Sequence, residues 1–242
     1  LANENQLEMR TMKKTVLFFV VTILIASFPH AQEATPSAEI TGADELVKKK
    51  GRFQETWVRP DADITQYSKL YLWQAVFQFR DVGGAKETAS TVSHLGSSGP
   101  YGVRDESKTK FEQVVSGSFV KALGQSKVFQ VVDEIGPNTL IVRAAVLDIV
   151  SDVPPKLTGV NNVYLSAVGE ATFVFELIDA ETGVIQARVA ERRNIQPDVR
   201  MNQVNSAPVN SSTVWNDVKR WAGDEAQALR KALEKAKKKG GK

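Results

Sequence analysis

Two apolar segments joined by a short turn constrain the fold of this chain more than any other feature. Residues 164–178 and 184–193 both carry apolar side chains at alternate positions. Between them, residues 179–183 (DAETG) have the composition of a tight turn, in which Gly183 can adopt a positive φ. An alternation of period two is typical of a β-strand with one buried face. The pair therefore predicts two strands of a sheet that another layer covers.

Three further segments have the composition of strands: residues 69–79, 128–132 and 139–150. The last of them is apolar on both faces over much of its length, so we expect it near the centre of the sheet. A helical pattern separates the first two, which allows a parallel pair with a right-handed crossover. The later strands follow one another by short links and are expected to be antiparallel.

Two segments show the spacing of three and four that is typical of amphipathic helices. The first begins near Asp105 or Ser107 and ends at Gly124, and the second begins after Ser211 and Ser212. Together with the strands they predict an α+β domain. Its sheet is mixed and mostly antiparallel, with about five strands and two main helices packed on it.

The N-terminal region has the three-part layout of a secretory signal peptide. Residues 12–14 (MKK) are basic, residues 15–28 are apolar, and Pro29 and Ala31 close the segment. We interpret residues 12–31 as a signal peptide cleaved near Ala31, which predicts a periplasmic or secreted protein without a membrane span. The apolar run reaches only about 21 Å, which favours cleavage over the alternative of an uncleaved membrane anchor.

The signal peptide interpretation divides the chain into further parts. We interpret residues 1–11 as an over-extended gene start and the polar residues 32–51 as a flexible leader. Residues 52–237 are expected to form a single α+β domain, and residues 238–242 a basic tail.

Composition excludes several kinds of chemistry. The chain has no cysteine, so it has no disulfide, thiolate metal site, cysteine nucleophile or lipid-modified cysteine. With only two histidines it cannot build a metal site from histidine alone, and we predict neither a metal nor a cofactor. The formal net charge of +3 depends on five lysines near the C-terminus, and without them it is negative. A basic surface for nucleic acid is therefore not expected.

Three local motifs resemble a known family. Residues 53–63 (FQETWVRPDAD), 67–69 (YSK) and 177–183 (LIDAETG) are similar to the secreted bacterial family catalogued as domain of unknown function 3313. The resemblance covers about residues 50–235. Because this family has no assigned activity, the resemblance implies no catalytic residues. Many members resemble lipoproteins, but the absence of cysteine here means that lipid anchoring is not carried over.

The order of elements is also similar to periplasmic domains of the curli-secretion lipoprotein and of lipoprotein activators of cell-wall synthases. Those domains resemble anticodon-binding α/β modules and act through protein contacts. This similarity concerns layout alone, and fold does not determine function.

Carboxylates are the strongest candidates for catalytic chemistry. Asp61 and Asp63 lie two residues apart, but Asp63 with Gln66 is better explained as the cap of a short helical turn. A periplasmic hydrolase is the alternative function, and it needs acidic residues that converge only in the folded chain. The candidates are Asp61, Asp63, Asp105, Asp148 and Asp152.

A non-enzymatic binding or assembly module of the periplasm or outer membrane periphery is the favoured function. The long Gly- and Ser-rich loop 80–104 holds His94, which lacks the third group and rigid oxyanion site of a serine–histidine nucleophile. We expect this loop to bind a partner, either an envelope protein or a second copy of the chain. No catalytic residue is predicted, and the candidate partner-binding residues are Trp57, Tyr67, His94, Tyr101 and Arg200.

Overall fold

Eight strands form one mixed sheet in the computed structural model of the chain, which describes residues 39–82, 100–154, 163–198 and 207–240. Strands β1, β2, β9, β8, β6, β3 and β5 follow one another across the sheet, and β4 also pairs with β6. Two short strands, β7 and β10, form a separate pair. The bounds are β1 Val47–Lys48, β2 Glu55–Val58, β3 Lys69–Leu72, β4 Val76–Phe79, β5 Gln130–Val132, β6 Thr139–Ser151, β7 Val163–Leu165, β8 Gly169–Asp179, β9 Ile185–Ile195 and β10 Ala207–Val209.

The long strands confirm the predicted topology. Strands β8 and β9 are antiparallel and are joined by the predicted turn, in which Gly183 has a φ of 71°. Strand β6 is central, with antiparallel β8 on one side and parallel β3 and β4 on the other. The parallel pair of β3 and β5 flanks the first helix in sequence, as expected.

The α+β class is confirmed, but the prediction of about five strands was too low. Residues 69–79 form two strands rather than one, because the chain breaks at residues 73–75 and both halves pair with β6. Strands β1, β2 and β10 are two to four residues long and show no clear alternation. Their sequences are too short to carry a periodic pattern.

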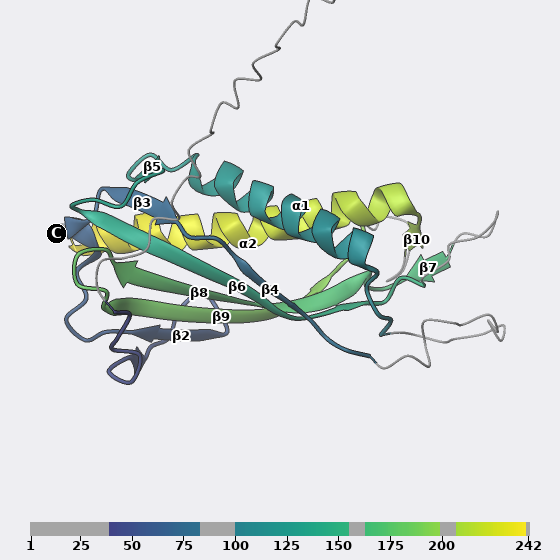
Figure 1. Ribbon diagram of the computed structural model, residues 1–242, viewed down its shortest axis with the longest axis horizontal. Coiled ribbons are helices and arrows are strands. Elements are labelled where there is room, and N and C mark those ends of the chain that lie inside the picture. The colour runs from purple at the N-terminus through teal and green to yellow at the C-terminus, as the bar shows by residue number, and fades with distance from the viewer. Residues whose placement is uncertain (1–38, 83–99, 155–162, 199–206, 241–242) are drawn as a thin grey trace, which may run out of the picture. The chain divides into compact units, whose positions relative to one another are not determined.

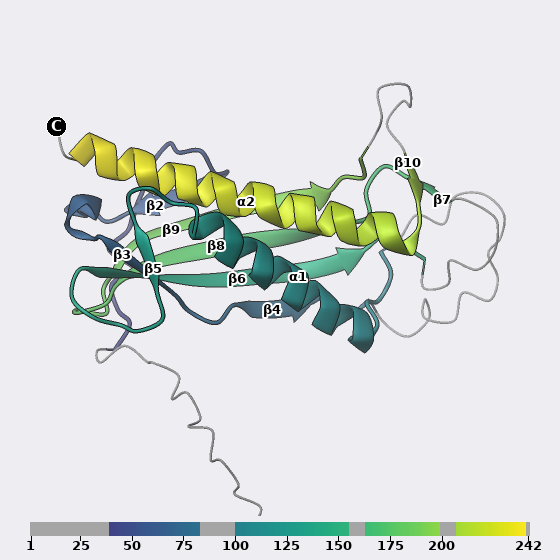
Figure 2. The same cartoon turned by 90° about the horizontal axis from the view of Figure 1, so that it is seen from above.

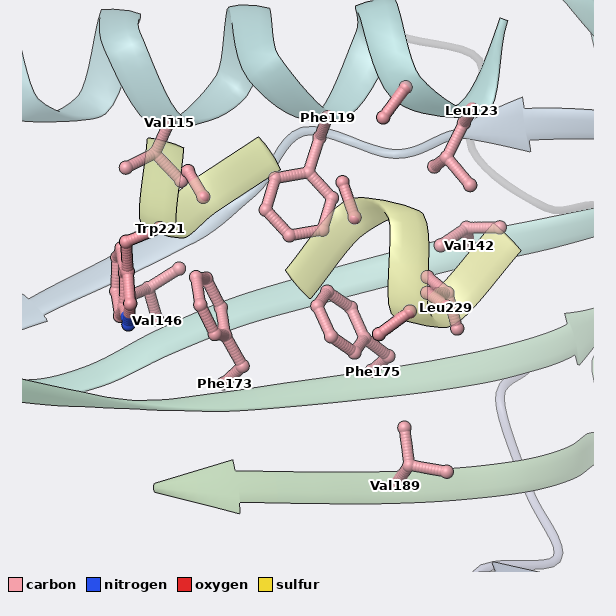
Figure 3. Close-up of a cluster of buried hydrophobic side chains, with 14 of the residues drawn as sticks. Val115, Phe119, Leu123, Val142, Val146, Phe173, Phe175, Val189, Trp221 and Leu229 are labelled. Carbon is pink, nitrogen blue, oxygen red and sulfur yellow. The ribbon is translucent and has the colours of Figure 1, made fainter. Parts of the chain in front are cut away.

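Both helices pack on the same face of the sheet (Figure 1). Helix α1 spans Asp105–Leu123 with Gly124 as its C-cap, and α2 spans Ser211–Gly240. The core lies between them and the sheet, where Phe119 of α1 meets Phe173 and Phe175 of β8 (Figure 3). The ring centroids of these pairs lie 5.5 and 5.2 Å apart, close enough for direct aromatic packing.

The opposite face of the sheet carries a smaller apolar cluster, centred on Ile141, Ile178 and Ile185. Part of the segment that we expected to be a flexible leader contributes here. Thr41 forms a bridge with Val184, and β1 pairs with β2. Residues 1–38, which include the expected signal peptide, lie outside the described residues.

The C-terminal part of α2 is attached to the first half of the domain. The Lys237 ammonium donates to the carbonyl oxygen of Tyr67 and lies 4.7 Å from the centre of the Phe129 ring. The helix therefore keeps contacts with the domain almost to its last turn. Over the described ranges, neither helix is both long enough and apolar enough to cross a membrane.

Candidate ligand-binding pocket

An apolar pocket of about 460 Å³ lies where the two helices begin. Figure 2 shows that α1 and α2 start at the same end of the sheet. There they meet the last residues of β6 and β9 and the residue that precedes β8. The walls are mainly apolar, and they include Phe79, Phe111, Ile149, Val168, Ile195 and Trp215.

The start of α2 is fixed by local hydrogen bonds. The side-chain oxygen of Asn210 accepts from the backbone N–H groups of Ser212 and Thr213, at 2.9 and 3.0 Å. Such a cap satisfies amide groups that a helix cannot pair internally. It also sets the first turns, from which Val214 and Trp215 line the pocket.

Aromatic rings form one wall of the pocket. The Phe111 ring of α1 contacts the Phe79 ring of β4 edge to face, with centroids 5.8 Å apart. Trp215 is half-buried, and the Lys110 ammonium lies 4.6 Å from the centre of its ring. A tryptophan in the wall also gives the pocket a spectroscopic reporter.

Few polar side chains line the pocket. They are Arg104, Ser107 and Ser151, of which Arg104 forms an exposed ion pair with Glu106 at 3.1 Å. Small-molecule sites are typically concave and apolar, with a small number of polar groups that orient the ligand. Both the volume and the lining of this pocket match that description.

The carboxylates proposed for a hydrolase are only partly brought together. Asp148 lies in a bulge of β6 with a φ of 56°, a left-handed conformation that is uncommon for aspartate. Hydrogen bonds from Arg80 and then Arg192 lower the pKa of its carboxyl to about 2. Glu170 contacts the same Arg192. Burial and the charge of Glu170 raise the pKa of Asp152.

Asp148 and Glu170 therefore belong to an ion-pair network with Arg80 and Arg192. A general base needs a pKa near the working pH, and the arginine partners hold the pKa of Asp148 far below it. Asp61 is exposed, and Asp105 pairs with Lys108 on α1. Asp63 accepts hydrogen bonds from Thr65 at the start of the 3₁₀ turn Ile64–Gln66, which confirms its predicted capping role. Within the described ranges, no three acidic or histidine side chains are placed to hold a metal ion.

A buried acidic cluster between α2 and β9 was missed by the sequence analysis. Glu225 is 1% exposed, and its carboxylate lies 3.2 Å from Arg193, which also contacts Glu191 at 2.7 Å. Burial raises the pKa of the Glu225 carboxyl group. One of its two oxygens has no hydrogen-bond partner among the described residues. In the sequence this residue lies four positions from both Trp221 and Leu229 in the apolar stripe of α2, and that spacing was a signal of its burial.

The five predicted partner-binding residues are not gathered in one place. Trp57 is half-buried on the sheet face away from the helices, with the Lys48 ammonium 5.8 Å from its ring. Tyr67 is 2% exposed and donates to Asp179 at 2.6 Å. Burial, with this hydrogen bond, raises the Tyr67 pKa.

Tyr101 is also buried, and it bridges Ser151 of β6. Neither tyrosine presents a surface to a partner in this conformation. His94 and Arg200 lie outside the described residues.

Several solved structures match the chain at low identity and with TM-scores below 0.5. A protein from Xanthomonas campestris, XCC0632 of the DUF330 family, is 11% identical with a TM-score of 0.42, covering 86% of this chain and 97% of that one. A PelC dodecamer from Paraburkholderia phytofirmans is 12% identical with a TM-score of 0.32, over 76% and 96% of the two chains. A putative neuraminyllactose-binding hemagglutinin homolog from Helicobacter pylori is 10% identical with a TM-score of 0.35, over 73% and 91%.

Comparison at the level of sequence families is more specific. No curated protein matches the chain. The model of the family described as "protein of unknown function (DUF3313)" matches residues 38–229, which is most of the sequence. That match confirms the resemblance carried by residues 53–63 and 177–183. The chain therefore belongs to the DUF3313 family of proteins of unknown function.

Proposed function

We propose that this protein is an exported, non-enzymatic binding module of the bacterial cell envelope, and that the pocket at the helix starts holds an apolar ligand. The observation that carries the proposal is the lining of the pocket, which is apolar apart from Arg104, Ser107 and Ser151. Apolar groups released from water gain about 25 cal/mol for each Å² that they bury. A ligand with an apolar body and a polar end would gain most here.

A hydrolase is less well supported by the same geometry. Asp148 and Glu170, which contact the same Arg192, are both paired with arginine. Neither lines the apolar pocket. A catalytic group would have to reach a bound substrate, and this pocket offers only two serines and one arginine for that purpose.

The first test measures binding of an apolar probe. Dodecanoate is expected to change the fluorescence of Trp215 on titration into the purified protein, because the ring lines the pocket. Val214→Trp places a large side chain in the same wall and should weaken binding at least about tenfold, or ~1.4 kcal/mol. The matched control is Val120→Trp, which changes a valine of α1 that is 55% exposed and outside this pocket.

Two results would reject the pocket as a binding site. One is a flat titration of the unmodified protein with both dodecanoate and a neutral apolar dye. The other is an affinity that Val214→Trp leaves unchanged while thermal melting shows that the variant is folded. Weakening by Val120→Trp to the same degree would indicate a general surface effect instead.

Export has its own test. If residues 12–31 are a signal peptide, N-terminal sequencing of the protein from the envelope fraction should begin at Gln32. A mature protein that still contains Val20 would show an uncleaved anchor, and recovery from the cytoplasm alone would contradict export. The binding test above does not depend on either result.

A further inference from the structure

Strand β4 leaves one edge of the main sheet open. It pairs with β6 on its inner side, and no other strand in the described ranges pairs with its outer side (Figure 2). Phe77 and Phe79 pack toward Phe111 of α1, so the helix covers the face of the strand and not its edge. An uncovered edge presents backbone N–H and C=O groups that can pair with another strand.

The outer strands β1 and β5 offer fewer residues for pairing than β4 does. Strand β1 has only two residues and is followed by Lys49 and Lys50, while β5 has three residues. Short length and lysine are devices that prevent strands from pairing between molecules. Strand β4 has four residues with no charge and no proline, and its Val76 is 58% exposed.

The direction of the hydrogen bonds shows which groups face outward. The N–H of Arg80, directly after β4, donates to the carbonyl of Ile149 in β6 at 3.0 Å. Backbone groups of successive residues in a strand point to opposite sides, so those of Gln78 also face β6 and those of Phe77 and Phe79 face outward. The open edge thus offers the N–H and C=O groups of two phenylalanines on either side of one glutamine.

This arrangement is self-complementary. We propose that two copies of the chain associate by antiparallel pairing of β4 with β4 of a second copy, with Gln78 opposite Gln78 on a two-fold axis. In that register Phe77 of each copy lies opposite Phe79 of the other, and their outward backbone groups form hydrogen bonds in both directions. The two rings extend the aromatic layer that already packs on Phe111.

The side chains fit the same register. A glutamine amide both donates and accepts, so Gln78 can pair with its own copy. The exposed Val76 falls opposite Arg80, whose alkyl part can cover it, and no two like charges face each other. In the symmetric dimer, Gln78 pairs with Gln78 of the other copy, and Val76 is covered by Arg80 of the other copy. Phe79 also lines the pocket at the helix starts, but the backbone pairing proposed here does not require a bound ligand.

Single cysteines provide a direct test, because the chain has none of its own. Residues opposite each other outside the hydrogen-bonded pairs have Cα atoms about 4.5 Å apart, within the range that a disulfide can bridge. Gln78→Cys is therefore expected to form a covalent dimer under mild oxidation. Val120→Cys, at an equally exposed valine on α1, should remain monomeric. Equal rates of cross-linking in the two variants would overturn the proposal.

A charge exchange tests the two-fold symmetry in the purified protein. Sedimentation of the unmodified chain should show a dimer, and Gln78→Lys should raise the dissociation constant at least about tenfold, because two lysines then face each other. Mixing Gln78→Lys with Gln78→Glu should restore the dimer. A chain that stays monomeric at about 100 µM, or a dimer that Gln78→Lys leaves intact, would overturn the proposal and leave a different partner for this edge.

Discussion

Replacing Trp221 by alanine is expected to lower the free energy of unfolding by about 3 to 5 kcal/mol. Trp221 is 6% exposed, and its ring lies 4.5 Å from Phe173 of β8 and 6.1 Å from Phe111 of α1. It therefore joins both helices to the sheet (Figure 3). The indole N–H has no hydrogen-bond partner among the described residues, so the loss comes from packing and from the cavity that remains. Urea unfolding measures it.

The matched control is another aromatic residue without such contacts. Tyr164 of β7 is 56% exposed, and Tyr164→Ala should change the stability by no more than about 0.5 kcal/mol. A typical domain has a stability of about 5 to 15 kcal/mol, so the two variants should differ clearly in their denaturation midpoints. If Trp221→Ala leaves the midpoint unchanged, α2 is not held on the sheet by this side chain.

Replacing Gly169 by alanine is expected to destabilise the protein by about 1 to 3 kcal/mol. Gly169 begins β8 opposite the irregular end of β6, and a Cβ atom there would lie 2.4 Å from the carbonyl oxygen of Val150. Because that neighbour is backbone within a paired strand, it cannot move without disturbing the sheet. Thermal or urea unfolding of Gly169→Ala measures the cost.

Gly117 provides the opposite case. A Cβ atom at Gly117, in the middle of α1, would meet nothing within 4 Å. Gly117→Ala should therefore stabilise the protein, by up to about 1 kcal/mol, through the higher helix propensity of alanine. If both alanine variants shift the midpoint in the same direction, the close approach at Gly169 is not what sets its stability.

Local chemistry explains which parts of the fold could be predicted from the sequence. The β8–β9 pair, the end of α1 at Gly124 and the cap at Asp63 depend on neighbouring residues, and all three were anticipated. Strands such as β2 form because a long partner is already in place: Glu55–Val58 pairs with β9 more than a hundred residues away. Four residues carry too little periodicity to reveal such a partner.

The pocket could not be predicted for a related reason. Its walls come from segments that are far apart in the chain, and each segment supplies only one or a few apolar residues. Val214 and Val218 belong to the apolar stripe of α2, where they cannot be distinguished from core residues. Only the folded arrangement shows that the helix starts leave space between them. The ion pair of the acidic residue Glu225 could not be anticipated, because its partner Arg193 is distant in the chain.

Helix α2 follows every strand of the sheet in the sequence. This order affects when the parts of the core can form. A ribosome delivers α1, β6, β8 and β9 before α2, so Phe173 can pack on Phe119 of α1 but not on Trp221 until α2 has been made. Until then the chain remains accessible to chaperones.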